Sequence, residues 1–208
     1  IDFWSSGKLE VRPFDGVRHL KILSVGNLNP LKGADILLSA LELIGYPWEL
    51  VLVGAELENH SSYAQDLRRL AAQLESPTRR TRFLGWQSPE QVRTLMKDSD
   101  VFVLPSRSEA CPLALLEAMA SGCVCIARDV GDVRDILEES RCGVIVTNES
   151  NSALAAAIKH VIEIDTAERQ RMGKLAQQGI ASRYSLQTQA EKHLDIYMKL
   201  ASISEGKK

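Results

Sequence analysis

Residues 101–122 of this 208-residue chain read VFVLPSRSEACPLALLEAMASG. The continuous apolar run at 101–104 predicts a strand that is covered on both faces, as in a parallel sheet. Pro112 suits the first position of a helix and Gly122 suits a helix C-terminal cap, so we expect a helix over residues 113–121. A strand followed by a loop and a helix is the repeating unit of an α/β protein.

The same unit recurs on both sides of this stretch. Further strands are expected at 21–25, 49–53, 81–84, 123–127 and 143–146, and further helices at 34–44, 62–74, 89–97 and 133–138. Beyond residue 148 only helices are expected, at 152–164, 167–182 and 186–201. Six alternations of strand and helix imply right-handed crossovers, and hence a doubly wound, Rossmann-like parallel sheet of about six strands with extra C-terminal helices.

Composition and charge exclude several classes of protein. Apolar residues make up 45% and charged residues 25% of the chain, the ordinary mix of a globular protein. The formal charge of −2 lacks the broad basic footprint of a nucleic-acid binder. No apolar run approaches the ~18 residues that span a bilayer, and the first residues do not resemble a signal peptide. Four cysteines are too few for a disulfide scaffold, so we expect buried thiols and a cytoplasmic location.

Two glutamates follow the strand that we expect at residues 101–104. Ligands of open parallel sheets bind outside the carboxyl ends of the strands, so these glutamates are candidates for a binding site. Glu109 precedes the helix, and Glu117 lies one turn below Leu113 among apolar neighbours. A carboxylate in such company needs partners, and a diol donates two hydrogen bonds. The free amides of Leu113 and Ala114 would form an anion site at the helix N-terminus. The alternative is a solvent-facing Glu117 and an ordinary loop at Glu109, which the apolar neighbours disfavour.

The loop after residue 25 is the second candidate. It carries Gly26, Asn27, Lys32 and Gly33 ahead of a helix, but it fits neither the Rossmann fingerprint nor the Walker A loop. Two glycines, an amide and one lysine at the mouth of the sheet suit the close approach of a phosphate. Taken alone, the loop is better explained as a tight turn with a solvated lysine.

Together these residues resemble a known family. The spacing from Glu109 to Glu117 fits the Glu-x7-Glu signature of retaining glycosyltransferases of the GT-B fold, and the chain looks like family 4 (group 1) of those enzymes. The stretches that agree with this family in order are 24–28, 32–33, 83–86, 99–106 and 131–136. The similarity spans roughly residues 21–200.

The resemblance implies a C-terminal, nucleotide-sugar-binding domain. By analogy, Lys32 would neutralise the donor diphosphate, Glu117 would hold the ribose hydroxyls, and Glu109 would hold the donor sugar. The amides of Cys111, Leu113 and Ala114 would line the sugar and phosphates, and the segment 85–87 would border the base. The expected catalytic residues are Lys32 and Glu109; the expected substrate-binding residues are Gly26, Asn27, Lys32, Gly85, Trp86, Glu109, Cys111, Pro112, Leu113, Ala114 and Glu117.

The sequence departs from the family pattern at two positions. Asn27 stands where many members have an arginine for the diphosphate, which removes one positive charge. Asp132 stands where a second glycine is common, which could narrow the loop after residue 127 or place a negative charge there.

The resemblance also implies how the chain is organised and what it binds. Residues 1–20 would be an interdomain arm, 21–201 the donor domain and 202–208 a flexible tail. Ile1 and Asp2 look like the end of the segment that closes the N-terminal acceptor domain, so we expect half of an enzyme that binds a nucleotide sugar but transfers none alone. The missing domain could also carry peripheral membrane association. No cofactor is expected, since the nucleotide sugar is a substrate.

Other motifs are given structural explanations. Asp98-Ser99-Asp100 spells the Asp-x-Asp motif that holds a metal in glycosyltransferases of another fold, but it lies at the start of a strand, so no metal is expected. The basic residues 79–82 are interpreted as a solvated strand edge without the aromatic interleaving of a nucleic-acid site. Two alternatives to a transferase stay open: a non-catalytic nucleotide-binding or interaction module, and a nucleotide-sugar epimerase of the same architecture.

Overall fold

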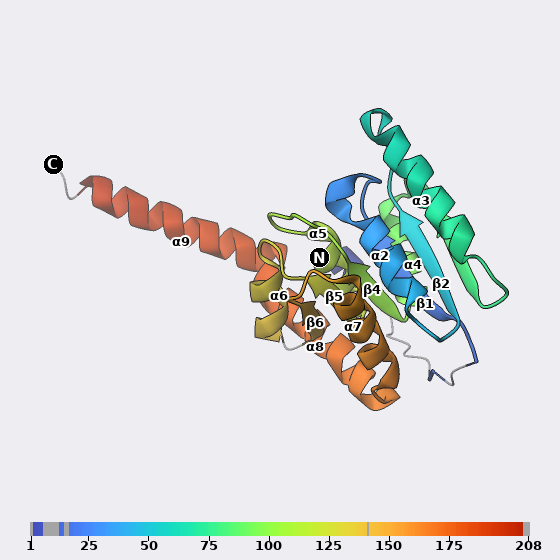
Figure 1. Cartoon of the computed structure of the whole chain (residues 1–208). Helices are drawn as coiled ribbons and strands as arrows, with labels where there is room; N and C mark the ends of the chain where they lie inside the picture. Colours follow the sequence, from blue (N-terminus) through green and yellow to red (C-terminus); the bar gives the residue numbers. More distant parts are fainter. Residues whose placement is uncertain (1, 6–12, 15–16, 141, 206–208) are drawn as a thin grey trace.

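The computed structural model describes residues 2–5, 13–14, 17–140 and 142–205 (Figure 1). These residues form a six-stranded sheet in the order β3-β2-β1-β4-β5-β6, and every neighbouring pair is parallel. Its strands are β1 (Leu20–Val25), β2 (Trp48–Val53), β3 (Arg79–Phe83), β4 (Val101–Leu104), β5 (Cys125–Arg128) and β6 (Gly143–Val146). The predicted doubly wound parallel sheet is confirmed.

Helices cover both faces of this sheet. They are α2 (Ala34–Glu42), α3 (Ser61–Leu74), α4 (Pro89–Asp98), α5 (Leu113–Ala120), α6 (Val133–Ser140), α7 (Asn151–Glu163) and α8 (Thr166–Tyr184). One apolar layer joins the sheet to α2, α3 and α7, and the other joins it to α4, α5, α6 and part of α8. Alternate residues of each strand enter the two layers because side chains on a strand point to opposite faces.

The strand order reverses between β1 and β4. These two central strands are paired in register at Ile22 with Val101 and Leu23 with Phe102. From β1 the chain proceeds outward to β2 and β3, and from β4 it proceeds outward the other way to β5 and β6. The loops that follow β1 and β4 therefore diverge at a topological switch point, where open α/β sheets form their ligand crevice.

Local sequence explains the helix starts near this crevice. At α4, Ser88 accepts a hydrogen bond from the Gln91 amide and the Gln91 side chain accepts one from the Ser88 amide, with Pro89 as the first helical residue. At α5, Pro112 is the N-cap rather than the first helical residue, and its carbonyl accepts hydrogen bonds from Leu115 and Leu116. The expectation for α4 is confirmed, and that for Pro112 is wrong by one position.

Strand boundaries differ from expectation where the sheet has an edge or a helix ends nearby. The edge strand β3 begins at Arg79 instead of residue 81, because polar side chains are tolerated on a half-exposed strand. β5 begins at Cys125 instead of residue 123, because the Cys123 amide donates to the Ala118 carbonyl and closes α5 instead.

Short parts of the expected arm and tail are helical. The helix α1 (Asp2–Ser5) lies against α5, Trp4 packs on the apolar layer beneath it, and Phe3 lies under the Arg93 guanidinium at 4.2 Å. Residues 2–5 of the expected interdomain arm are therefore helical, while residues 1, 6–12 and 15–16 lie outside the described residues. At the other end, a helix continues through residues 202–205 of the expected flexible tail, and residues 206–208 lie outside the described part.

The last helix, α9 (Leu186–Glu205), projects away from the sheet (Figure 1). Its large apolar side chains are exposed, namely Leu186, Leu194, Ile196, Tyr197, Met198 and Leu200. The helix therefore leaves apolar surface uncovered. Within the described residues, no helix combines the length and the apolar character that crossing a membrane requires.

Candidate functional site

A pocket of about 690 Å³ opens at the switch point between β1 and β4. It is lined by Val25, Gly26, Asn27, Lys32, Trp86, Leu104, Glu109, Cys111, Pro112, Leu113, Ala114 and Glu117. The fold thus brings together every residue that the sequence predicted for the site except Gly85. That glycine lies next to Trp86, and its carbonyl accepts a hydrogen bond from Gly54 at 2.9 Å.

The loop after β1 is shaped to bring Lys32 toward β4. The Asn29 side chain accepts a hydrogen bond from the Lys32 amide at 3.2 Å and caps a single 3-10 turn, Pro30–Lys32. Gly33 follows with φ of +68°, and a Cβ there would lie 2.1 Å from the Pro105 carbonyl oxygen. Only glycine allows the two loops to approach this closely.

Lys32 and Glu109 form an ion pair inside the pocket. The Lys32 Nζ donates to Glu109 Oε1 at 2.7 Å and to Oε2 at 2.9 Å, and the Ser106 hydroxyl also donates to Oε1 at 2.7 Å. The Glu109 side chain is 8% exposed whereas that of Lys32 is 36% exposed. The carboxylate is therefore fixed from behind, while the ammonium stays accessible from the pocket.

The N-terminus of α5 faces the same pocket with unused donors. Leu113 and Ala114 are its first two residues, and their backbone N–H groups have no acceptor among the described residues. Such groups, together with the helix dipole, favour an anion. A phosphate placed here would meet two N–H groups and the Lys32 ammonium.

Glu117 lies one turn further along α5, half-buried in the pocket wall. Its neighbours Leu116 and Ala118 are buried, and its carboxylate makes no hydrogen bond or ion pair with any residue that the structure describes. Burial raises the pKa of this carboxyl group above its ordinary value. A half-buried carboxylate without a partner is costly to the free protein and has acceptor capacity for a ligand.

The two departures from the family pattern take defined positions. The Asn27 side-chain oxygen accepts a hydrogen bond from the Ala55 amide at 3.2 Å, so this residue binds the loop after β2. The Asp132 amide donates to the Ala110 carbonyl at 3.0 Å, next to Gly131, where a Cβ would lie 2.2 Å from the Glu109 carbonyl oxygen. The loop after β5 therefore packs on the backbone of Glu109. Partial burial, and secondly the charge of Asp132, raise the pKa of the Cys111 thiol.

Comparison with known proteins decides the family. Residues 16–179 match the family described as "Glycosyl transferases group 1". The chain belongs to this family.

Individual relatives agree with this assignment. The chain is 28% identical over 186 residues to a D-inositol 3-phosphate glycosyltransferase of Corynebacterium urealyticum, covering 87% of this chain and 43% of that protein. It is 31% identical over 191 residues to glycogen synthase 2 of Nitrosococcus oceani, covering 86% and 37% respectively. The chain thus spans about two fifths of the length of these curated relatives.

A solved structure extends the likeness to the fold. Anabaena HepE, in a crystal structure with UDP-glucose, is 25% identical with a TM-score of 0.77, covering 88% of this chain and 49% of that one. The architecture of this group 1 chain is therefore that of one half of a GT-B glycosyltransferase.

Two residues of this group 1 chain were missed as parts of the site. Ser106 is fully buried and holds Glu109, and Arg107 holds the Lys32 loop: its guanidinium donates to the Pro30 carbonyl at 2.6 Å and to both Asp35 oxygens at 2.6 and 2.8 Å. Although burial acts to raise it, hydrogen bonds from Arg107 and Tyr63 hold the pKa of Asp35 below its ordinary value. A serine and an arginine directly after a buried strand were the available signal.

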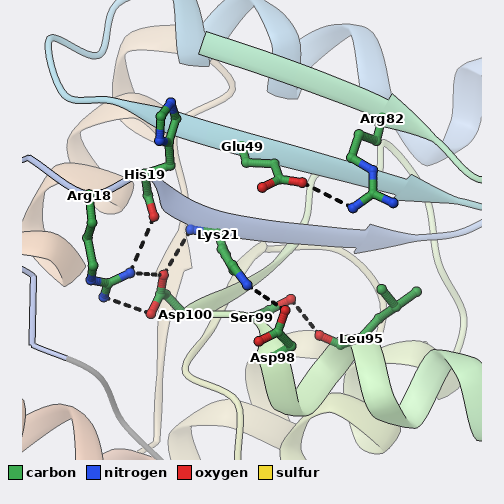
Figure 2. Close-up of polar contacts among 9 residues, drawn as sticks. All are labelled: Arg18, His19, Lys21, Glu49, Arg82, Leu95, Asp98, Ser99 and Asp100. Carbon is green, nitrogen blue, oxygen red and sulfur yellow. Dashed lines mark hydrogen bonds and ion pairs between the residues drawn. The ribbon is translucent and has the colours of Figure 1, made fainter. Parts of the chain in front are cut away.

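The Asp-x-Asp motif lies beside the start of β1 (Figure 2). This is the amino edge of the sheet, meaning the side on which the strands begin, whereas the donor pocket lies at the carboxyl edge, on which they end. Arg18 donates to the two Asp100 oxygens at 2.7 and 2.9 Å, and the Lys21 amide donates to Asp100 at 2.8 Å. The Lys21 ammonium donates to Asp98 at 2.5 Å. Both carboxylates therefore bind the start of β1. Among the described residues no group of three or more side chains has the composition of a metal site.

Proposed function

We propose that the pocket between β1 and β4 binds a nucleoside diphosphate sugar, and that this chain is the donor half of a retaining glycosyltransferase. The observation that carries the proposal is the convergence of Lys32, Glu109, the free α5 N–H groups and Glu117 on one pocket of about 690 Å³. Membership of the group 1 family supports it. The names of the relatives, among them a glycogen synthase, favour a hexosyl donor.

Positive potential for the diphosphate would come from two sources. Lys32 supplies a full charge at the mouth of the pocket, and the N–H groups of Leu113 and Ala114 supply hydrogen bonds reinforced by the helix dipole. With Asn27 in place of an arginine, the site relies on these groups. Because these residues provide the positive potential directly, we propose that binding needs no metal ion.

Donor binding would exchange the partner of Lys32. In the free chain its ammonium is bound to Glu109 at 2.7 Å, and a diphosphate with more charge would draw it away. Glu109, still held by Ser106 at 2.7 Å, would then accept hydrogen bonds from hydroxyl groups of the donor sugar. The ion pair thus holds both catalytic groups in position before the substrate arrives.

The nucleoside would occupy the remaining length of the pocket. Glu117 would accept two hydrogen bonds from the ribose diol, which supplies the partners that this half-buried carboxylate lacks. Trp86, 71% exposed on the rim beside Gly85, would cover the base by stacking.

The chemical step we propose is transfer with retention. The bond between the anomeric carbon and the diphosphate oxygen breaks, Lys32 stabilises the charge that grows on the departing diphosphate, and the acceptor hydroxyl attacks from the same face. Its proton passes to the departing phosphate oxygen. A second domain would bring the acceptor and exclude water by closing over the pocket. We propose that the enzyme acts in the cytoplasm and takes part in polysaccharide biosynthesis.

Ligand-detected NMR and thermal shift with UDP-, GDP- and ADP-sugars test the proposal. We expect one nucleotide sugar to raise the melting temperature in proportion to its binding, and Lys32→Ala to remove that rise. Lys174→Ala is the matched control, since it removes an exposed lysine of α8 that does not line the pocket. The absence of binding by every sugar nucleotide would favour an interaction module, and conversion of the donor sugar without an acceptor would favour an epimerase.

A further inference from the structure

A second pocket, of about 350 Å³, lies at the same carboxyl edge of the sheet and shares no lining residue with the donor pocket. It is lined by Ile36, Arg107, Arg128, Glu149 and Asn151. Its volume falls within the range of about 300–1,000 Å³ that is typical of small-molecule sites. Of its side chains, only that of Arg107 has a place in the donor site, where it holds the Lys32 loop.

The second pocket lies on the opposite face of the sheet from α5. Cys125 and Ala127 of β5 belong to the apolar layer of α5, whereas Ile126 belongs to the layer of α2 and α7. Because side chains on a strand alternate, Arg128 at the end of β5 points to the face of α2 and α7. Ile36 of α2 and Asn151 of α7 line the pocket on that face.

Arg128 is the unusual feature of this pocket. Its side chain is only 8% exposed, yet its one hydrogen bond among the described residues runs from Nη1 to the Ser106 carbonyl at a long 3.4 Å. Nη2 forms a long ion pair with Glu149 at 3.8 Å, beyond hydrogen-bond distance, and the Glu149 side chain is 92% exposed. A guanidinium has five N–H donors, so most of those of Arg128 lack an acceptor among the residues that the structure describes. A buried charge with so few partners is expensive unless an anion completes it.

Other charged and polar groups also surround the pocket. Arg107 lines it, but its guanidinium is bound to Asp35 and to the Pro30 carbonyl. Asn151 is the first residue of the thirteen-residue helix α7, whose N-cap Ser150 accepts a hydrogen bond from the Ala153 amide. The amides of Asn151 and Ser152 have no acceptor among the described residues. The positive end of this helix therefore adds to the charge of Arg128.

We propose that this second pocket binds the phosphoryl group of a small phosphorylated molecule. Arg128 would hold two phosphate oxygens in a bidentate contact, and the N-terminus of α7 would face a third. Glu149, which is loosely placed and almost fully exposed, would move aside as the anion enters. The pocket has room for roughly ten water volumes, which accommodates a phosphate with a small organic group attached.

Titration of the chain with inorganic phosphate, followed by isothermal calorimetry and amide chemical shifts at constant ionic strength, tests this site. We expect saturable binding with shifts at Arg128 and at the start of α7. Arg128→Ser should weaken binding by at least about tenfold because it removes charge-assisted hydrogen bonds. Glu149→Gln should strengthen binding several-fold, since it removes the competing carboxylate from an exposed position where folding is not at risk.

Further variants separate this site from the donor pocket and from simple charge attraction. Lys32→Ala should leave the phosphate response of the second pocket intact, and acetate should bind more weakly than phosphate if two anionic charges are recognised. Arg128→Lys should not restore full affinity, because lysine lacks the planar fork. The proposal is overturned if the response disappears in Lys32→Ala, if Glu149→Gln does not strengthen binding, or if phosphate causes no saturable shifts at α7.

Discussion

The amino and carboxyl edges of the central sheet both carry a buried or half-buried carboxylate, but Asp100 at the amino edge is paired with residues that the structure describes, whereas Glu117 at the carboxyl edge is not. At the amino edge, Asp100 is 3% exposed and accepts three hydrogen bonds, two from Arg18 and one from the Lys21 amide. At the carboxyl edge, Glu117 is half-buried and accepts none from the described residues. Since buried polar groups normally find partners, Glu117 is a departure from that rule beside the donor pocket.

The difference separates structural from functional charge. The carboxylates at the amino edge bind the start of β1, and the Asp-x-Asp spacing there has a structural explanation (Figure 2). At the carboxyl edge, the Lys32 ammonium stays accessible beside its ion pair with Glu109, and the Glu117 carboxylate has no partner among the described residues. Proteins keep such costs where they serve a ligand.

The largest effect is expected at Lys32. In a protein that carries both halves of the enzyme, Lys32→Ala should lower kcat by roughly 10²–10³, because removing one transition-state stabiliser costs about that much. Donor affinity should fall by less, since the charge on the diphosphate grows as it leaves. Steady-state kinetics against the Lys174→Ala control measure the split, and unchanged kcat would remove Lys32 from the catalytic machinery.

Removing the Asp100 carboxylate at the amino edge should lower the free energy of unfolding and leave donor affinity unchanged. Asp100→Ala removes the three acceptor contacts and leaves the partly buried Arg18 without this carboxylate, at a cost of roughly 3 kcal/mol in the free energy of unfolding. Urea denaturation gives that value, and donor titration of the folded variant should match the wild type. A loss of donor affinity in the folded state would mean that the two edges are not independent.

Unlike Asp100→Ala, Glu117→Gln should raise the stability of the free protein. The neutral amide avoids the cost of burying a charge, so the melting temperature of the free protein should rise slightly. The donor dissociation constant should increase roughly ten- to a hundredfold through the loss of charge-assisted hydrogen bonds to the ribose. Thermal shift and calorimetry measure the two effects. A lower melting temperature with unchanged donor affinity would show that Glu117 has a structural role instead.

The smallest expected effect is the pH dependence of that stability difference. Burial raises the folded-state pKa of Glu117 above its ordinary value of 4.5, so the folded state binds the proton more tightly than the unfolded state. The stability that this tighter proton binding gives to the folded state is complete below pH 4.5 and is lost as the pH rises through the raised pKa of Glu117. The advantage of Glu117→Gln should therefore be absent near pH 4 and constant at neutral pH. Melting curves of both proteins across this range check the sign.

Sequence patterns predicted most of the fold but only part of the site. β4 and β6 begin and end where expected because continuous apolar runs have clear limits. Lys32, Glu109 and Glu117 could be proposed from two loops and a helix. The roles of Ser106 and Arg107 could not, because they depend on the distance between loops that are far apart in the chain. Arg128 was missed because a charged residue at a strand end has no periodic signature.

The placement of the donor pocket at the switch point also has a consequence for how the protein is made. Lys32 and Glu109, which meet at 2.7 Å, are 77 residues apart in the chain. At a synthesis rate of about 5–20 residues per second, roughly 4–15 s separate the appearance of the two on the ribosome. Between the synthesis of residue 53 and that of residue 101, β1 already has β2 to pair with but not β4. The donor pocket therefore cannot exist until α5 has been made, and ligands that require it cannot assist the pairing of β1 with β2.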